Sequence, residues 1–317
     1  MLRIGVVGVG HMGRRHAEKV LALRDAGADV TLAGVTDVDP ERARGVAAAL
    51  GVPVARDAGS LFGDADAAVV AVPTVHHYDV VRHALHQGLD VLVEKPITAT
   101  LEQGEALVDL MERRRRVLHV GHLEWYNAAT RALHGRIRSP SFVEVRRMGP
   151  FPDRATDVDV VRDLMIHDID ILQQILGEEP ETIESIGVRV VTGNVDIANA
   201  RLGFSSGCVA SLTASRVSGA PVRTMRFFQR DGFVFIDFLA QSASIHRRLV
   251  NSGDGAPHIA SDEVKFDPED ALLTQLRAFV DAVGRRDVPA PSATSALGAL
   301  RTALRVIDAM PVSDARE

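Results

Sequence analysis

Short apolar runs alternate with helix-like stretches along the first third of the chain. Continuous apolar runs predict buried strands, and apolar residues three or four positions apart predict helices with one buried face. The predicted strands are 2–9, 30–36, 67–72, 90–94 and 117–121, and the predicted helices are 14–26, 40–50, 77–87 and 101–114. Strands that alternate with helices pair in parallel through right-handed crossovers. The pattern therefore predicts an α/β domain with a doubly wound parallel sheet over residues 1–121.

The pattern changes after Gly121. One helix is predicted over 163–176, and strand-like runs then follow one another without intervening helices. These runs are 182–191, 198–204, 208–215, 223–229 and 233–237. Strands joined by short turns favour an antiparallel sheet. Two helices, 267–284 and 292–309, close the chain. We expect residues 122–317 to form a second, α+β domain, whose last helices stay with it or pack back on the first domain.

Composition narrows the class of protein. The chain has 317 residues, a net charge of -6 and no run of Lys and Arg among aromatics, which disfavours a nucleic-acid partner. Its single cysteine, Cys208, allows no internal disulfide and no zinc cluster, as in a reducing compartment. The chain starts in a strand pattern, and no apolar stretch is long enough to span a bilayer. We expect a cytoplasmic protein with no metal and no membrane partner.

A glycine pattern follows the first predicted strand. It reads Gly8-Val9-Gly10-His11-Met12-Gly13 and leads into a helix. Gly8 permits a tight turn, Gly10 lets the backbone approach a pyrophosphate, and Gly13 lets helix and strand pack closely. Backbone N–H groups at the helix start, including those of His11 and Met12, would hold the phosphate charge. The alternative is an incidental glycine-rich turn. Between this strand and this helix, the pattern predicts a Rossmann dinucleotide site.

Asp37 stands at the end of the second predicted strand. A carboxylate there accepts hydrogen bonds from ribose hydroxyls and repels a 2′-phosphate, which favours NAD over NADP. Alternatively, Asp37 caps the following helix together with Asp39.

A lysine follows the fourth predicted strand in the sequence Glu94-Lys95-Pro96. Ligands of a doubly wound sheet lie beyond the carboxyl ends of its strands, so Glu94 and Lys95 are expected at the cofactor. Lys95 could hold a hydroxyl or carbonyl oxygen by a charge-assisted hydrogen bond. The alternative is a lysine in a surface loop.

An Asp–His pair lies on the helix predicted over 163–176. Asp163 and His167 are four residues apart and share one helix face. The pKa of histidine lies near neutral pH, which suits His167 to take a proton from a hydroxyl group, with Asp163 binding substrate or orienting the imidazole. An apolar stripe anchors the helix, formed by Met165, Ile169, Leu172 and Leu176. The alternative is a structural histidine.

The ordered set of these motifs resembles the glucose–fructose oxidoreductase, inositol dehydrogenase and rhizopine catabolism (Gfo/Idh/MocA) family, over nearly the whole chain. Pro73, Thr74 and His77 also match that family's loop on the nicotinamide side. The resemblance implies an NAD-dependent enzyme acting on CH–OH groups, with Lys95, Asp163 and His167 as its catalytic group. It also implies an open-faced sheet used for contacts in a homodimer or homotetramer.

The stretch from Gly121 to Asn127 resembles members of the family that act on nucleotide sugars, such as UDP-N-acetylglucosamine 3-dehydrogenases. This chain has Trp125-Tyr126 where those members have Arg-Phe. The resemblance implies Glu124, Tyr126 and Asn127 as substrate-binding residues and C3 of a UDP-N-acetylhexosamine as the oxidised position. Alternatively, the stretch is a strand that leads into a packed helix.

Three other functions stay open from sequence. One is a dehydrogenase of inositol, another polyol or a free sugar, and another is a non-catalytic sensor of nucleotides. The third is cleavage of a glycosidic bond through transient oxidation.

Overall fold

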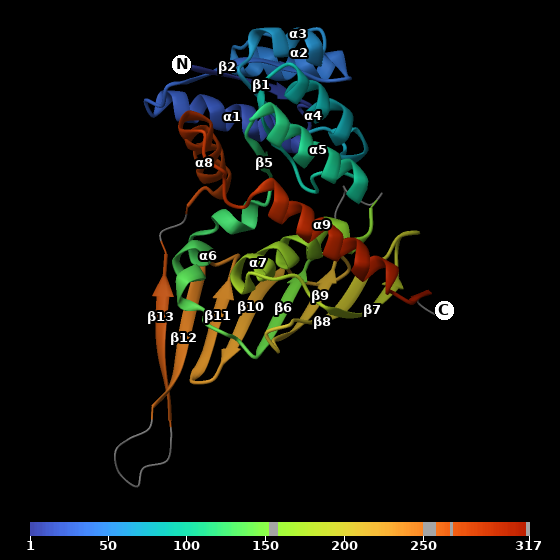
Figure 1. Ribbon diagram of the computed structural model, residues 1–317, viewed down its shortest axis with the longest axis vertical. Helices are drawn as coiled ribbons and strands as arrows, with labels where there is room; N and C mark the ends of the chain where they lie inside the picture. The colour runs from blue at the N-terminus through green and yellow to red at the C-terminus, as the bar shows by residue number, and fades with distance from the viewer. Residues whose placement is uncertain (152–157, 250–257, 267–268, 315–317) are drawn as a thin grey trace. The chain divides into compact units, whose positions relative to one another are not determined.

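A computed structural model describes residues 1–151, 158–249, 258–266 and 269–314 of the chain (Figure 1). The chain forms two compact units. Unit 1 comprises Met1–Leu123 and Asp270–Leu297, and unit 2 comprises Glu124–Glu269 and Gly298–Glu317. Unit 1 is therefore discontinuous in sequence: it takes in a segment near the C-terminus as well as the first 123 residues.

Unit 1 is built on a parallel sheet. Its five strands lie in the order β2-β1-β3-β4-β5, and every neighbouring pair is parallel. The strands are β1 Leu2–Val7, β2 Val30–Thr36, β3 Ala67–Val70, β4 Asp90–Val93 and β5 Leu118–Val120. The helices are α1 His11–Asp25, α2 Pro40–Leu50, α3 Ala58–Asp64, η1 Thr74–His76, α4 His77–His86, α5 Leu101–Arg114 and α8 Ala271–Arg285. The strand order reverses direction between β1 and β3, which is where doubly wound sheets bind their ligands. The predicted Rossmann fold is confirmed.

Helix α8 completes the core of unit 1. Its apolar residues Leu276 and Phe279 are fully buried in the cluster that contains Ile4 and Val6 of β1. Ion pairs fasten both ends of the helix, Lys19 to Asp270 at 2.6 Å and Arg286 to Asp90 at 2.8 Å. The helix predicted over 267–284 thus begins at Ala271, and residues 267 and 268 lie outside the described residues.

Unit 2 is built on a larger mixed sheet. In the described part of the chain it has nine strands in the order β13-β12-β11-β10-β6-β9-β8-β7-β14. The pairs β6–β9 and β7–β14 are parallel and the others antiparallel. The strands are β6 Phe142–Met148, β7 Thr182–Arg189, β8 Ile197–Gly203, β9 Val209–Ser215, β10 Val222–Gln229, β11 Gly232–Asp237, β12 Ser242–Leu249, β13 His258–Lys265 and β14 Val312–Asp314.

The sequence pattern predicted five of these strands, β7 to β11. It missed β6 and β12 because charged side chains interrupt their apolar pattern: β6 reads FVEVRRM and β12 reads SASIHRRL. It also missed β13 and the short β14. In β6 only alternate positions are buried, and one of these is an arginine. A charge at a buried position hides the alternation on which strand prediction depends.

Helices cover one face of the unit 2 sheet (Figure 1). They are α6 Ala128–Leu133, α7 Ile166–Leu176 and α9 Ala293–Asp308, of which α9 belongs to unit 2 from Gly298 on. The short helical turns in this part of the chain are η2 Leu123–Tyr126, η3 His134–Arg136 and η4 Val161–Met165. Along β8, Ala198, Ala200 and Leu202 are buried in the core, whereas Asn199 and Arg201 are exposed. One face of the sheet therefore carries the core, and the other is open, as predicted.

Among the described residues, every helix is too short or too polar to cross a membrane.

Candidate active site

The glycine loop of unit 1 requires its glycines. Gly8 has a φ of +82°, and a Cβ there would lie 2.7 Å from the carbonyl oxygen of Ala71. A Cβ on Gly13 would lie 1.7 Å from the carbonyl oxygen of Gly8. Gly10 is different, because a Cβ at that position would meet no atom within 4 Å. The first and third glycines thus permit tight packing of the loop on itself, and the second leaves open space.

The space at Gly10 fits a pyrophosphate. Gly10 is the N-cap of α1, and no side chain caps this helix end. The N–H groups of the first turn, from His11 to Gly13, therefore present the positive end of the helix dipole beside an open position. This cradle is what a dinucleotide needs, so the residues present fit NAD.

Asp37 lies at the end of β2 with its side chain 5% exposed. Its Oδ2 accepts the N–H of Val9 at 2.7 Å, and its Oδ1 accepts the N–H of Asp39 at 2.9 Å. Arg42 also contacts Oδ1, at 3.2 Å. The cap of α2 is Asp39, whose side chain accepts the N–H groups of Glu41 and Arg42. Asp37 therefore ties the glycine loop to β2, and its carboxylate retains lone pairs for ribose hydroxyls.

Lys95 follows β4, next to the half-buried acid Glu94, which pairs with a buried histidine. Glu94 receives a 2.8 Å contact from Nε2 of His16, a fully buried residue of α1. Burial opposes ionisation of Glu94, but the hydrogen bond and charge of His16 outweigh it and lower the pKa of Glu94. A Cβ on Gly121 would lie 3.0 Å from Glu94 Oε2, so this glycine leaves room for the acid. The residue before Lys95 is thus held by His16, in space that Gly121 leaves open.

His77 joins two loops at the same edge of the sheet. Its Nδ1 lies 2.8 Å from the carbonyl oxygen of Pro96, and its Nε2 lies 3.0 Å from that of Val72. The ring is 1% exposed, and burial lowers its pKa. His77 thereby connects the Lys95 loop with the loop that carries Pro73 and Thr74. Its ring nitrogens are used within the protein.

Asp163 and His167 occupy a π turn and the first turn of α7 in unit 2. The π turn spans Val161–Met165 and the α-helix begins at Ile166, whereas sequence predicted one α-helix from Asp163. Both residues are half-buried, while Met165 and Ile169 are fully buried in the core. The stripe predicted to anchor the helix is confirmed at Met165, Ile169 and Leu172. Inserted π turns are frequent at functional sites.

Arg147 of β6 holds the residue after His167. It is 3% exposed, and its Nε and Nη2 donate to the two carboxylate oxygens of Asp168 at 2.9 and 2.8 Å. Its Nη1 donates to Glu124 at 2.8 Å, and Arg223 contacts the same Glu124 oxygen at 3.4 Å. Burial opposes the charge on Arg147, but Asp168 and Glu124 outweigh it and raise the pKa of Arg147.

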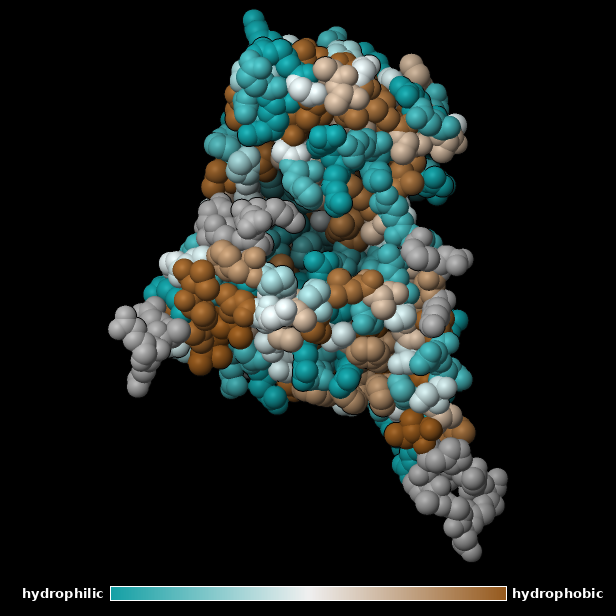
Figure 2. All heavy atoms as spheres, turned by 180° about the vertical axis from the view of Figure 1, so that it is seen from behind, coloured by the Kyte–Doolittle hydropathy of each residue, from teal (hydrophilic) through white to brown (hydrophobic). Residues whose placement is uncertain are grey.

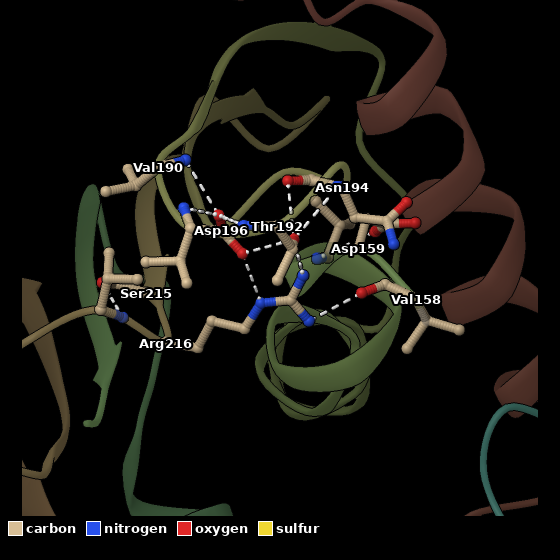
Figure 3. Close-up of polar contacts among 11 residues, drawn as sticks. Val158, Asp159, Val190, Thr192, Asn194, Asp196, Ser215 and Arg216 are labelled. Carbon is tan, nitrogen blue, oxygen red and sulfur yellow. Dashed lines mark hydrogen bonds and ion pairs between the residues drawn. The ribbon is translucent and has the colours of Figure 1, made fainter. Parts of the chain in front are cut away.

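A second buried arginine lies near the start of the π turn (Figure 3). Arg216 is 1% exposed; its Nε donates to Asp196 at 2.8 Å and its Nη1 to the carbonyl oxygen of Val158 at 2.7 Å. Asp196 also accepts backbone N–H groups from Val190, Val191 and Thr192. Burial opposes ionisation of Asp196, but these N–H groups and Arg216 lower its pKa below the usual range.

The residues predicted to bind substrate lie largely inside unit 2. Tyr126 is 4% exposed and Asn127 7%. The amide of Asn127 donates to the carbonyl oxygen of Phe238 at 3.1 Å, and its Oδ1 accepts the N–H of Ala129. Glu124 pairs with Arg147. These polar groups fix the segment in unit 2, and direct contact with substrate stays a prediction.

Lys95 belongs to unit 1, and Asp163 and His167 belong to unit 2. Sequence reasoning missed His16, Arg147 and Arg216, because their partners are distant in sequence. In the described residues, no group of three His, Cys, Asp or Glu side chains could hold a metal ion.

Comparisons with known proteins cover both units. The family model for the oxidoreductase family with an NAD-binding Rossmann fold (GFO_IDH_MocA) matches residues 2–122, and the GFO/IDH/MocA C-terminal domain matches residues 129–234. The UDP-N-acetylglucosamine 3-dehydrogenase of Acidithiobacillus ferrooxidans is 36% identical over 89% of this chain and 88% of its own. A crystal structure of that enzyme has a TM-score of 0.91 at 34% identity, covering 98% of this chain and 97% of the other.

A more distant relative is the myo-inositol 2-dehydrogenase of Thermotoga maritima, 27% identical over 92% of this chain and 91% of its own. Both matched segments, the glycine loop and the fold of each unit lead to one conclusion. This chain belongs to the Gfo/Idh/MocA family of NAD-dependent oxidoreductases, which act on CH–OH groups.

Proposed function

We propose that this chain oxidises a secondary alcohol of a sugar nucleotide with NAD, at C3 of a UDP-N-acetylhexosamine. The observation that carries the proposal is the likeness to UDP-N-acetylglucosamine 3-dehydrogenase, which extends through both units at 36% identity. A likeness confined to residues 2–122 would support only nucleotide binding. Because it includes unit 2, which holds Asp163 and His167, it supports the same kind of substrate.

Three side chains divide the chemistry in this proposal. His167 takes the proton of the substrate hydroxyl, Lys95 stabilises the oxygen, and Asp163 orients the imidazole or a neighbouring hydroxyl. An ammonium about 4 Å from a developing alkoxide contributes on the order of 4 kcal/mol at an effective dielectric of about 20. NAD, when bound, supplies the acceptor for the hydride from the same carbon.

The cofactor side of the proposal uses unit 1. The N–H groups of His11, Met12 and Gly13 hold the pyrophosphate, and Asp37 accepts hydrogen bonds from the ribose. Pro73 and Thr74 line the nicotinamide side, and His77 fixes their loop to the Lys95 loop through its two carbonyl contacts. Glu94, kept ionised by His16, stands beside Lys95 at the same strand end.

The substrate side uses the segment from Glu124 to Asn127. We assign Glu124, Tyr126 and Asn127 to the substrate site as residues that shape it. Their hydrogen bonds within unit 2 hold this segment in one conformation. Preorganised walls reduce the entropy lost when a substrate binds.

We also propose a cytoplasmic homodimer or homotetramer. The open face and edge of the unit 2 sheet expose apolar side chains: Ile186 is 52% exposed, Val190 47%, Val191 61% and Val312 42%. Figure 2 shows apolar side chains gathered over the end of unit 2 where β7 and β14 lie. Such patches mark contact surfaces in soluble proteins. Light scattering of the purified protein measures the oligomer.

The test is turnover on a panel of substrates. Purified protein is mixed with NAD and UDP-N-acetylglucosamine, UDP-N-acetylgalactosamine, their uronates or myo-inositol, and NADH absorbance is followed. NADH formation with a UDP-N-acetylhexosamine, and a product lacking two hydrogen atoms, would support the proposal. Turnover of myo-inositol alone would favour the second candidate, which the Thermotoga relative supports. NAD binding without turnover of any substrate would favour a sensor.

Lys95→Ala tests the residue assignment within that assay. We expect kcat to fall by about a thousandfold, the equivalent of about 4 kcal/mol, while NAD affinity changes by less than about threefold. Unchanged turnover would remove Lys95 from the mechanism.

A further inference from the structure

The segment 158–168 carries both Asp163 and His167, and a buried arginine holds each of its ends. We propose that Arg147 and Arg216 are positioning residues that clamp this segment and keep its π turn in place. The assignment of Asp163 and His167 to catalysis rests on the proposed function, but the clamp itself is a property of unit 2 alone.

Arg216 holds the first end. Its guanidinium donates to the carbonyl oxygen of Val158 at 2.7 Å, to Asp196 at 2.8 Å and to the hydroxyl of Thr192 at 3.0 Å. Figure 3 shows these contacts converging on one guanidinium. Asp196 is fully buried and is itself held by three backbone N–H groups. The direction of the guanidinium is therefore set from outside the segment that it holds.

Val158, which Arg216 holds, is followed directly by the residue that binds the first N–H groups of the π turn. The next residue, Asp159, accepts the N–H groups of Val161 at 3.0 Å and Arg162 at 2.9 Å through its Oδ1. Its carbonyl oxygen accepts the N–H of Asp163 at 3.1 Å. The side chain of Asp159 thus binds the first N–H groups of the turn, and Arg216 fixes the residue that precedes Asp159.

Arg147 holds the second end. It binds both carboxylate oxygens of Asp168, the residue after His167, in a fork of 2.8 and 2.9 Å. Its strand β6 lies inside the sheet, paired with β10 on one side and β9 on the other. A bidentate fork fixes orientation as well as distance. The first turn of α7 therefore has a fixed rotation relative to the sheet.

A π turn needs such support because it is less stable than an α turn. A π turn accommodates one extra residue within a helix. It is rare, because without other stabilising contacts the α-helical conformation is preferred. If the segment relaxed into an α-helix, residues before the slip would rotate by about 100° relative to those after it. Asp163 and His167 lie on either side of the junction at Ile166, so relaxation would separate the two side chains.

Lysine substitutions test the clamp while keeping the buried charge. Arg216→Lys cannot reach Asp196, Thr192 and Val158 together, and Arg147→Lys loses the fork to Asp168. Arg305→Lys is the matched control, since Arg305 of unit 2 also donates to backbone carbonyls, those of Pro180 at 2.7 Å and Glu181 at 2.9 Å. We expect kcat to fall about a hundredfold in each clamp variant and less than about threefold in the control, with NAD affinity unchanged in all three.

Hydrogen exchange supplies a readout that does not need activity. Amides of 158–168 should exchange at least about tenfold faster in Arg216→Lys and Arg147→Lys than in wild type and Arg305→Lys. If neither exchange nor kcat distinguishes the clamp variants from Arg305→Lys, the proposal is wrong. If wild type turns over no substrate, the proposed function fails while the exchange comparison still decides the clamp.

Thr192→Val is a second variant that tests the Arg216 end of the clamp if Arg216→Lys does not fold. It removes the hydroxyl that accepts from Arg216 Nη2 and donates to Asp196, and that also accepts the N–H of Asn194 at 3.1 Å. A smaller acceleration of exchange in 158–168 would support the clamp. Exchange equal to wild type would overturn it at this end.

Discussion

The two units hold the residues proposed for the site by different physical means. In unit 1 the cofactor cradle is made by backbone: a positive φ at Gly8, a close approach at Gly13 and the uncapped start of α1. In unit 2 the half-buried residues Asp163 and His167 lie on a π turn and on the first turn of α7 that follows it, with a buried ion pair near each end of the segment.

This difference determines how each unit responds to change. A glycine of the backbone cradle can be replaced only where no atom lies close to the position that a Cβ would take. The loss of stability on substitution therefore depends on the free space around each glycine. In an ion network, substitutions of a few buried charged residues have the largest effects. Removing one partner leaves the other charge buried and unpaired. We expect the contrast to show in variants of both units, beginning with the largest effect.

His167→Asn should separate the chemistry of unit 2 from the binding function of unit 1. Loss of a general base lowers kcat by about 10²- to 10⁴-fold. NAD affinity, measured by titration calorimetry, should stay within about threefold, since the cradle lies wholly in unit 1. A variant that kept more than about a tenth of wild-type kcat would exclude His167 as the base.

Gly13→Ala should damage both stability and cofactor binding in unit 1. Its Cβ would lie 1.7 Å from the carbonyl oxygen of Gly8, so α1 must move away from β1. We expect a loss of about 3 kcal/mol or more in the free energy of unfolding, measured in urea.

Gly10→Ala is the matched control for that variant. Its Cβ meets nothing within 4 Å, and Gly10 has a φ of -64° that any residue can adopt. Unfolding free energy should change by less than about 0.5 kcal/mol while NAD affinity falls. Equal destabilisation of both variants would contradict a role for close packing at Gly13.

Asp37→Ala should reduce the preference for NAD over NADP by about tenfold, because a charged hydrogen bond of about 1.5 kcal/mol is lost. The measurement is the ratio of kcat/KM for the two cofactors. A ratio equal to that of wild type would remove Asp37 from cofactor selection.

Mild acid should weaken unit 1 through His119. Burial, together with the charges of His122 and His16, lowers the pKa of His119 to about 3. A histidine held neutral in the folded state stabilises above its unfolded pKa, and this contribution is lost as pH falls. From pH 7.5 to about 5.5 the loss is about 1.4 kcal/mol, taking an unfolded pKa of about 6.5.

His119→Gln, which cannot be protonated, should remove that part of the pH dependence of urea unfolding. Asp196 of unit 2 has a lowered pKa, so it loses stabilisation only in much stronger acid. A pH dependence identical in His119→Gln and wild type would show that His119 does not couple to unfolding.

Much of unit 1 could be predicted from sequence because its signals are local. The glycine loop, its strand and its helix occupy consecutive residues, and the strands are mostly apolar, as in β3, which reads AAVV. The positions of Asp37 and Lys95, directly after β2 and β4, could be predicted because the strands themselves could, and the roles of both residues stay predictions. His16 could not be predicted, since its contact with Glu94 spans 78 residues.

In unit 2 the sheet could be predicted, but the contacts around Asp163 and His167 could not, because they join residues distant in sequence. Arg147 looks like a surface residue in sequence, and its ion pairs with Asp168 and Glu124 explain its burial. The π turn at Val161–Met165 could not be distinguished from an α-helix by apolar spacing, because Met165, Ile169 and Leu172 fit both. The clamp at Arg216 joins residues as far apart as Val158 and Arg216.

The discontinuity of unit 1 sets the order of events during synthesis. Its first 123 residues leave the ribosome long before α8, whose Leu276 and Phe279 close the apolar core around β1. Domains generally fold in the order of translation. The core of unit 1 cannot be completed, however, until residues up to Leu297 have been synthesised, and until then the apolar surface that α8 covers stays exposed. The nascent chain therefore presents chaperones with an unfinished first half for most of its elongation.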